Sequence, residues 1–492
     1  MKFLIDTNIF IPLEPTKLDD FSQMSKQIQD LHRLISTAGH HICIHESSKF
    51  DILRDRDQER KSIRLNSFGK YQLVSTPKHS FEFVVQQLGE VSNKSNDWVD
   101  FQMIGALHAD AVDGLITEDV RLMKRGDKLG FSDRIFSVQE ALNYLKRFLY
   151  DESFTPPPSV RKVDAYEIDF SAPFFDSFRD DYPKFDEWSR KVKREHRSIW
   201  LIDGDESTPY AAVCIIKHES SEDYPAKNLE FQKKVLKICS FKVASNFIGF
   251  GYGELLLKSV FEYANSNDFS YCYLTIFDKH VSLIALVQTF GFYRDIINEQ
   301  FRDVFYIKSF SPNVLDSENL GSLEYNIKFG PHIIHREKGN TFIVPILSGF
   351  QKVLFPEVEE QLSTLVGVNE AGNSLRKAYL SNSSIKAIDA GSIILFYSSK
   401  VRKSIVAVGV VEKAIQTENP DRIARLVSKR TVYTYNQIEE LCRKRKVIAI
   451  LFRQAIILKQ PISLEKLIQN GLLKMAPRSI QSISKEVLNW IH

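Results

Sequence analysis

The chain of 492 residues has little cysteine and no long apolar run. Its five cysteines include no Cys-x-x-Cys pair, which argues against a zinc site made of thiolates. No stretch reaches the roughly 18 apolar residues of a transmembrane helix, because Arg453 and Gln454 interrupt the best candidate. The first apolar run is broken by Asp6, so it does not resemble a secretion signal. We therefore expect a cytoplasmic protein with reduced cysteines that does not enter a membrane.

An excess of one charge is also absent from the chain as a whole, whose formal net charge is only +3. The charges are nevertheless unevenly distributed. Residues 421–492 hold 14 lysines and arginines against 5 aspartates and glutamates, so the first 420 residues carry a net charge of −6. An acidic body followed by a basic tail favours a polyanionic partner at the tail.

The length suggests about three domains, at roughly 150 residues for each domain. Three consecutive prolines within residues 150–159 predict a stiff linker, because proline continues neither a helix nor a central strand. Proline and glycine also punctuate a weakly patterned stretch at 309–345. We predict a multidomain α/β protein with domains at 1–150, 158–325 and 326–492.

The first segment places acidic residues where predicted strands end. Asp6 follows the run Phe3-Leu4-Ile5, Glu46 follows the run at 41–44, and Asp119 follows the run at 114–116. Strands that alternate with helices predict a parallel sheet, whose carboxyl ends lie along one edge. Carboxylates that converge there suit Mg²⁺ or Mn²⁺, which can activate water for phosphodiester cleavage.

Each of these acids taken alone is better explained as a helix N-cap or a surface charge. Together they resemble the PIN-domain nucleases: a strand ending Asp-Thr-Asn, a strand-end Glu about 40 residues later, an Asp that leads a helix, and a Leu-Ile-Thr-x-Asp. The resemblance implies a metal-dependent ribonuclease, commonly a toxin. Its catalytic and metal-binding residues would be Asp6, Glu46, Asp100 and Asp119, supported by Asn8 and Thr117, with Asp97 and Glu118 as competing assignments.

The second segment contains a glycine-rich loop, Ile248-Gly249-Phe250-Gly251-Tyr252-Gly253, just before a predicted helix over 254–263. Glycines let a backbone approach a ligand closely, and a helix N-terminus offers N–H groups to phosphate. The lysine and serine or threonine of a nucleotide-triphosphate P-loop are absent, which argues against ATP. By itself the loop is equally well explained as a tight structural turn.

The elements around this loop resemble the GNAT acetyltransferases over residues 160–310. Strand-like runs precede the loop, and a run at 271–277, a short helix from His280 and Phe290-Gly291-Phe292-Tyr293 follow it. The resemblance implies a mixed sheet that binds acetyl-CoA beside the strand at 236–243. The pyrophosphate would contact the backbone amides of Gly249, Gly251, Tyr252 and Gly253.

This segment departs from the GNAT pattern at three positions. Ile248 stands where the family usually has Arg or Gln, and His280 stands where Asn is frequent. Val287 stands at the place of a tyrosine that often protonates the leaving thiolate, a role that His280 or Asp278 would have to take. Binding of acetyl-CoA and acetyl transfer are therefore separate predictions.

The third segment is rich in predicted strands, at 392–397, 405–411 and 447–453, and a basic run at 443–446 precedes the last of them. A charge run alone is usually a solvated face. Further cations and two aromatic residues strengthen a prediction of RNA binding, since cations contact phosphates and rings stack on bases. These residues are Lys429, Arg430, Arg478, Phe396 and Tyr397.

The third segment also resembles the PUA-like modules of the ASCH and EVE types. The resemblance rests on the run from Ile388 to Tyr397, a valine-rich strand after it, and the closing run from Met475 to Ile480. It implies a β-barrel that recognises RNA or a modified nucleotide, and it names no pocket residues.

We predict an RNA-targeting effector of the toxin or phage-defence type, in which a metal nuclease cuts RNA beside an acetyl-CoA-binding centre and an RNA-binding tail. Expected partners are RNA, including tRNA, an antitoxin protein and a second copy of the chain. In the alternative prediction, the GNAT-like segment is the working enzyme and acetylates a tRNA-linked amine or a protein. A third interpretation, a scaffold without chemistry, stays open because of Ile248 and Val287.

Overall fold

The computed structural model describes the chain apart from residues 17–22, 150–159, 226–228, 231, 299–302, 359–373, 386, 400–401, 428–429, 431–432 and 492. The predicted proline linker and Lys429 lie outside the described residues. The chain forms two compact units. The first comprises Met1–Ser153, Asn419–Lys429 and Tyr433–Glu440, and the second comprises Phe154–Glu418, Arg430–Val432 and Leu441–His492.

The first unit contains a five-stranded parallel sheet in the order β3-β2-β1-β4-β5. The strands are β1 (Lys2–Ile5), β2 (His41–His45), β3 (Gln72–Val74), β4 (Gly114–Ile116) and β5 (Ile135–Phe136). Because β1 runs parallel to both β2 and β4, the residues that follow these three strands lie at one edge. The predicted parallel α/β fold of this segment is confirmed.

Helices surround this sheet in the first unit. They are α1 (Thr7–Leu13), α2 (Gln23–Thr37), α3 (Lys49–Leu53), α4 (Gln58–Ser67), α5 (Lys78–Leu88), α6 (Asn96–His108), α7 (Val120–Lys128) and α8 (Val138–Leu149). Apolar side chains of the sheet and of α6 form one buried cluster, which includes Leu4, Cys43, Met103, Ile104 and Leu115.

A distant part of the chain completes the first unit. Helix α17 (Pro420–Val427) and most of α18 (Tyr435–Lys444) belong to it, although they come from the predicted tail segment. Arg425 pairs with Asp113 at 2.8 Å, and the other Asp113 oxygen accepts the backbone N–H of Lys2 at 2.8 Å. The compact units therefore do not follow the linear order of the predicted segments, and the three-domain division stays a prediction.

The second unit contains a seven-stranded mixed sheet in the order β11-β12-β10-β9-β8-β7-β6. Its strands are β6 (Val160–Asp164), β7 (Ser198–Asp203), β8 (Tyr210–Ser220), β9 (Lys234–Val243), β10 (Tyr271–Phe277), β11 (Tyr293–Asn298) and β12 (Asp303–Ser309). Only the β9–β10 pair is parallel among these neighbours. The predicted mixed sheet is confirmed.

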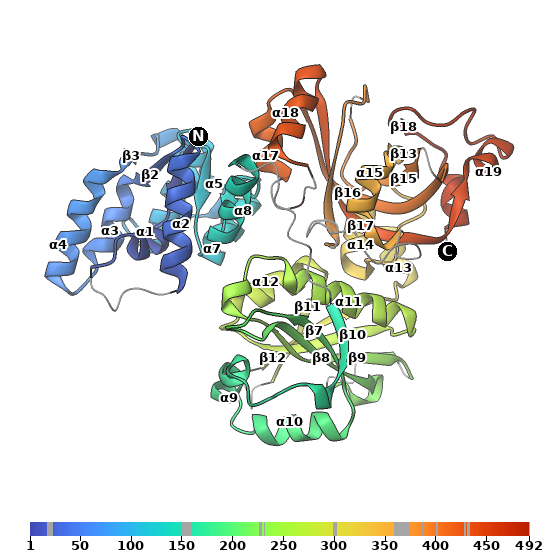
Figure 1. The fold of residues 1–492 in the computed structure, drawn as a ribbon, viewed down its shortest axis with the longest axis horizontal. Helices are drawn as coiled ribbons and strands as arrows, with labels where there is room; N and C mark the ends of the chain where they lie inside the picture. The colour runs from blue at the N-terminus through green and yellow to red at the C-terminus, as the bar shows by residue number, and fades with distance from the viewer. Residues whose placement is uncertain are drawn as a thin grey trace. The chain divides into compact units, whose positions relative to one another are not determined.

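Helices cover both faces of the seven-stranded sheet, as Figure 1 shows. Helices α11 (Tyr252–Ser266) and α12 (Val281–Thr289) pack on one face, and α9 (Asp176–Asp181) and α10 (Phe185–Arg194) pack on the other. Leu256, Val260 and Phe261 of α11 are fully buried against the sheet.

A second sheet in this unit has six strands in the order β14-β17-β16-β15-β13-β18. Its strands are β13 (Thr341–Ile346), β14 (Arg376–Ser381), β15 (Ile393–Ser398), β16 (Ser404–Thr417), β17 (Val447–Ser463) and β18 (Gln481–Ser482). Helices α13 (Val314–Asn319), α14 (Ser322–Phe329), α15 (Ser348–Leu354) and α19 (Leu464–Gln469) accompany it. The mixed, strand-rich character is confirmed, whereas closure into a PUA-like barrel stays a prediction.

The two aromatic residues proposed for base stacking are inside this second sheet. Phe396 and Tyr397 are both 0% exposed, and the Phe396 ring packs 4.7 Å from the Phe355 ring and 4.9 Å from the Phe452 ring. The prediction that they stack on RNA bases is therefore wrong, because both belong to the core.

None of the five cysteines, all of which the structure describes, forms a disulfide, and Cys43, Cys214 and Cys272 are buried. Within the described ranges, no helix combines the length and the apolar character needed to cross a lipid bilayer.

Candidate functional site

The central strands of the seven-stranded sheet separate part of the way along. β9 and β10 pair in parallel from Val235–Tyr271 to Ile238–Leu274. Beyond this point β9 continues beside β8 alone, and β10 continues beside β12 alone. Among the described strands, none pairs with the facing edges of residues 239–243 and 275–277, so their backbone groups can bind another molecule.

A β-bulge lies at the point where the strands separate, which we call the branch point. Ile216 pairs with Ile238 and Ile215 pairs with Ser240, so Cys239 has no residue opposite. The extra residue of a bulge is left unpaired, and the local ladder is disrupted. The neighbouring Ser240 hydroxyl is buried and has no hydrogen-bond partner among the described residues. The branch point thus presents polar groups that suit a bound carbonyl oxygen.

The glycine loop leads directly into α11. Gly249 and Gly251 have φ of +89° and +78°, and Gly251 occupies the N-cap position without a side-chain cap. The first N–H groups of a helix lack partners inside the helix and attract anions. A Cβ built on Gly251 would meet nothing within 4 Å, so the space above this amide is open. The loop and helix start therefore fit a phosphate group.

Gly253 allows α11 to pack closely on α12. A Cβ at this position would lie 2.7 Å from Cδ2 of Leu286. Gly249 and Gly251 lie in the loop before α11, and Tyr252 and Gly253 begin the helix, whereas their contact with a pyrophosphate stays a prediction.

A buried acid lies on the opposite face of the sheet from α11. The Glu219 side chain is 5% exposed and accepts hydrogen bonds from the Tyr273 hydroxyl at 2.6 Å and from Lys217 at 2.8 Å. Lys237 lies 4.0 Å away. Burial, and then the bond to Glu219, raises the pKa of Tyr273. Burial likewise raises the pKa of the Cys239 thiol, with a smaller contribution from Glu219, which places this acid near the branch point.

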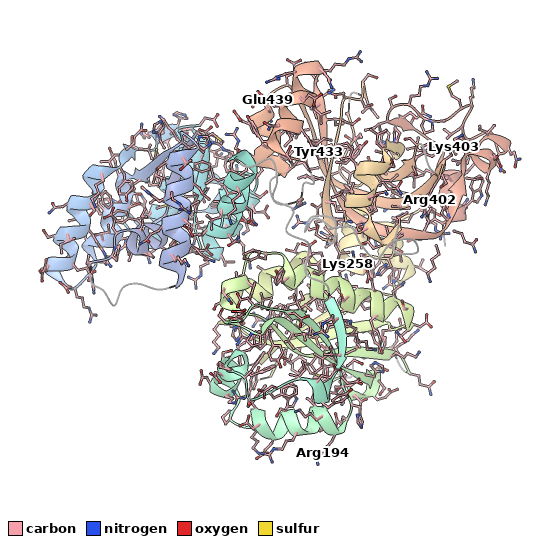
Figure 2. All side chains as sticks on the ribbon, viewed as in Figure 1. Arg194, Lys258, Arg402, Lys403, Tyr433 and Glu439 are labelled. Atoms are coloured by element: carbon pink, nitrogen blue, oxygen red, sulfur yellow. The ribbon has the colours of Figure 1, made fainter. Side chains whose placement is uncertain are left out.

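Arg197 connects the branch point with the end of α10. Its Nη1 lies 3.3 Å from Sγ of Cys239, and its Nη2 lies 2.6 Å from a Glu195 oxygen. Four exposed cations precede Arg197 in the sequence and lie on α10. They are Arg190, Lys191, Lys193 and Arg194. Figure 2 labels the last of them, Arg194, at the outer side of the helix.

The positions that depart from the GNAT pattern have different surroundings. Val287 is 0% exposed in the core, so this position offers no proton donor. His280 contacts Asp181 at 3.3 Å, and the Asp278 side chain is 69% exposed. Ile248 is exposed to solvent. The sequence pattern named none of Glu219, Tyr273 and Arg197, because they converge only through strand register.

At the sheet edge of the first unit, Asp6 is held by short hydrogen bonds. Its two oxygens accept the Thr7 backbone N–H and the Thr117 hydroxyl, each at 2.6 Å. Thr117 also accepts a hydrogen bond from the Asn8 amide at 3.2 Å. Thr117 therefore holds Asp6 directly and Asn8 holds Thr117, whereas their role in a nuclease site stays a prediction.

Three of the four predicted acids influence one another. Burial raises the pKa of Asp6 to about 6, and repulsion from Asp51 and Asp119 adds to the rise. Burial, followed by repulsion from Asp6, raises the pKa of Asp100 to about 7 despite the attraction of Arg125. Asp6, Asp100 and Asp119 thus lie near one another, where ionised carboxylates repel.

The fourth acid at this edge is Asp51 of α3. It accepts a hydrogen bond from the Thr7 hydroxyl at 3.0 Å. Glu46 is exposed, and no described interaction of the three other acids involves it. From the sequence we selected Glu46, which directly follows β2. The helix after it, α3, brings Asp51 to the sheet edge instead. Asp51 could have been found in the sequence as the next acid after Glu46, five residues later and inside the following helix.

The competing assignments differ in their contacts. Glu118 accepts the backbone N–H of Val138 at 2.7 Å, at the start of α8. Arg125 bridges Asp97 and Asp100, at 2.7 Å and 2.5 Å. Asp119 accepts backbone N–H groups in the first turn of α7.

A metal centre is not formed by these side chains as they stand. Among the residues that the structure describes, no group of three or more histidine, cysteine, aspartate or glutamate side chains has an arrangement that would hold a metal ion. The predicted Mg²⁺ or Mn²⁺ centre at Asp6, Glu46, Asp100 and Asp119 thus lacks structural support.

The raised pKa of Asp100 predicts a pH-dependent cost of folding. The folded state binds a proton that the unfolded chain releases near its ordinary value of 3.8, so the ionised form costs stability above about pH 7 and the cost disappears toward pH 4. We expect D100N to stabilise β1 and β4 by about 1–3 kcal/mol at pH 8 and by little at pH 4, measured by amide hydrogen exchange. D110N, at an 84%-exposed side chain, is the control, and equal behaviour of the two variants would contradict the prediction.

Residues 162–292 match the acetyltransferase (GNAT) family. No curated protein matches the chain. An IAA acetyltransferase from Bacillus cereus is 19% identical over 31% of this chain and 99% of that chain, with a TM-score of 0.23. A GNAT-family acetyltransferase structure from Desulfovibrio desulfuricans is 12% identical over 31% and 99%, with a TM-score of 0.24.

The ASCH protein from Zymomonas mobilis is 15% identical over 30% of this chain and 92% of that chain, with a TM-score of 0.24. The family match includes both the branch point at Cys239 and the glycine loop. The second unit of this chain therefore contains a GNAT-family acetyltransferase domain, at residues 162–292.

Proposed function

We propose that the chain is an N-acetyltransferase that uses acetyl-CoA and acetylates an amine carried by an RNA, with tRNA as the leading candidate. The observation that supports this most is the joint presence, in one domain, of separating strands, a bulge and an open helix N-terminus. The family match favours acetyl transfer over the ribonuclease that we ranked first from the sequence.

The residues of the cofactor site have distinct roles in this proposal. The amides of Gly249, Gly251, Tyr252 and Gly253 would bind the pyrophosphate, because the start of α11 is open and carries a partial positive charge. The unpaired edge of β9 would hydrogen-bond the pantetheine arm. When bound, acetyl-CoA supplies an acetyl group activated as a thioester.

The branch point would position the reacting groups. The backbone at Cys239 and the Ser240 hydroxyl would donate hydrogen bonds to the thioester oxygen as negative charge develops there. The acceptor amine would take the acetyl group from the thioester, CoA would leave as its thiolate, and the amine nitrogen would lose a proton. Glu219 lies near this point and is hydrogen-bonded to the Tyr273 hydroxyl. Its carboxylate would receive the proton from the amine.

An RNA-linked acceptor is favoured by the cations around the branch point. Lys217, Lys237 and Arg197 lie near it, and four more exposed cations continue along α10. Basic residues in the last turn of α10 also stabilise the helix itself. Helix stabilisation does not explain Lys217, Lys237 and Arg197, which lie outside α10. A basic path that leads to an amine-acetylating centre suits an amine attached to a phosphate backbone.

The glycine loop provides the first test. In G251A, the φ of +78° would cost an alanine about 1–2 kcal/mol. We therefore expect the affinity for CoA to fall about tenfold. G130A has a similar φ of +81° and equally open space in the first unit, and should leave CoA binding unchanged. Isothermal titration of the full chain measures both affinities, and similar affinities for the two variants would exclude this loop as the binding site.

The two basic runs provide the second test. Changing the four exposed α10 cations to Gln should weaken tRNA binding. It should reduce the slope of log Kd against log salt concentration by about 2–3. It should also abolish labelled acetyl transfer to aminoacylated tRNA. The same change at residues 443–446, which hold four exposed cations of the tail, is the matched variant. If only the tail variant loses binding, the α10 path is wrong, and transfer to a lysine-rich peptide alone would identify a protein acceptor.

A metal-dependent ribonuclease is a second candidate function, favoured by the close group of acids in the first unit. Asp6, Asp51, Asp100 and Asp119 would bind Mg²⁺ or Mn²⁺ after rearranging, because a cation relieves the repulsion between them.

The two acids after β2 distinguish the versions of this second candidate. We expect D51N to lose RNA cleavage in Mn²⁺ and E46Q to keep it, since only Asp51 contacts the residue beside Asp6. Gel analysis of labelled RNA measures both. Cleavage by wild type that survives in D6N prepared in parallel would show that the activity is a contaminant.

A further inference from the structure

The first turn of α11 is attached to the six-stranded sheet of the same unit. Glu254 is the third residue of α11, and its Oε1 accepts the backbone N–H groups of Leu375 at 2.8 Å and Arg376 at 2.9 Å. Arg376 is the first residue of β14, and Leu375 directly precedes the strand. One carboxylate oxygen therefore joins the helix that starts at the phosphate opening to the C-terminal sheet.

Leu375 is fixed on both of its sides. Its side chain is 3% exposed and belongs to the hydrophobic cluster that α11 forms with the GNAT sheet. Its carbonyl accepts the backbone N–H of Gln454 in β17 at 2.7 Å. A shift of β14 or β17 would therefore be transmitted to Glu254 through well-packed groups.

The second turn of α11 repeats this attachment. Lys258 is 5% exposed, lies one turn after Glu254 and forms an ion pair with Glu357. The Gln454 amide donates to the same Glu357 oxygen at 3.3 Å. Figure 2 shows Lys258 on α11 and Arg194 on the opposite side of the GNAT sheet. The attached face of α11 is thus remote from the basic face of α10.

These contacts carry a consequence for the phosphate opening. Gly253, which would donate an amide to the pyrophosphate, directly precedes Glu254. A free carboxylate in the first turn of this helix would repel a phosphate nearby, whereas the two N–H bonds hold it toward β14. The same bonds hold the start of the helix in place, so less order has to be gained when the cofactor binds.

We propose that Glu254 is a positioning residue through which the C-terminal sheet sets the affinity of the acetyl-CoA site, with Lys258 as a second attachment. This inference rests on the proposed function. Coupling between two sites is reciprocal, so a bound cofactor stabilises the start of β14 by the same free energy that β14 contributes to cofactor binding. The C-terminal sheet is then part of the acetyltransferase and not only a module attached to it.

The test uses the full chain and CoA itself as the probe. Isothermal titration should give about tenfold weaker binding for E254A. E254Q should bind within about threefold of wild type, since its amide oxygen still accepts both N–H groups. E59A, which removes an exposed acid from the first turn of α4 in the first unit, should also stay within about threefold. Hydrogen exchange should show that CoA protects residues 375–381 in wild type and does so less in E254A.

The outcomes separate this inference from the function on which it rests. No CoA binding by wild type would overturn the acetyl-CoA assignment, and the coupling with it. Wild-type affinity in E254A, together with unchanged exchange at 375–381, would overturn the coupling alone. If E254A does not fold, K258Q replaces it, with weaker CoA binding and reduced protection of β14 as the expected result and wild-type behaviour as the contrary one.

Discussion

The separation of β9 from β10 after Ile238 and Leu274 is the constraint on which the chemistry of the second unit depends. A sheet that stayed paired along its whole length would use every backbone group for its own ladder. Here two central strands release their facing edges inside the fold, and the bulge at Cys239 lies where the release begins. Buried apolar clusters pack on both faces of the sheet around these strands.

Helix α11 links three parts of the structure. Its start faces the glycine loop, its apolar side is buried against the sheet, and its first two turns are bound to β14 and Glu357. The closeness of Gly253 to Leu286 shows how little space the helix has to move. A single rigid element therefore connects the phosphate opening with the C-terminal sheet, which explains why the two sheets form one compact unit.

Features that depend on local sequence were predictable, and features that depend on long-range register were not. The strand ending at Ile5, the glycine loop and the basic face at residues 443–446 follow from neighbouring residues. The convergence of Glu219 with Tyr273 requires two strands to align across a third, and no local pattern encodes this. Asp51 was missed because the bend between β2 and α3 decides which acid returns to the edge. The burial of Phe396 likewise depends on partners distant in the chain, Phe355 and Phe452.

In the proposed acetyltransferase, acetyl-CoA binds across the start of α11 with its thioester at the branch point. A crystal structure of the full chain with acetyl-CoA tests this most directly. We expect pyrophosphate oxygens within hydrogen-bond distance of the amides of Gly249, Gly251, Tyr252 and Gly253, and the thioester oxygen beside the backbone of Cys239. Acetyl-CoA bound elsewhere, or β9 and β10 closed against each other with the cofactor excluded, would contradict it.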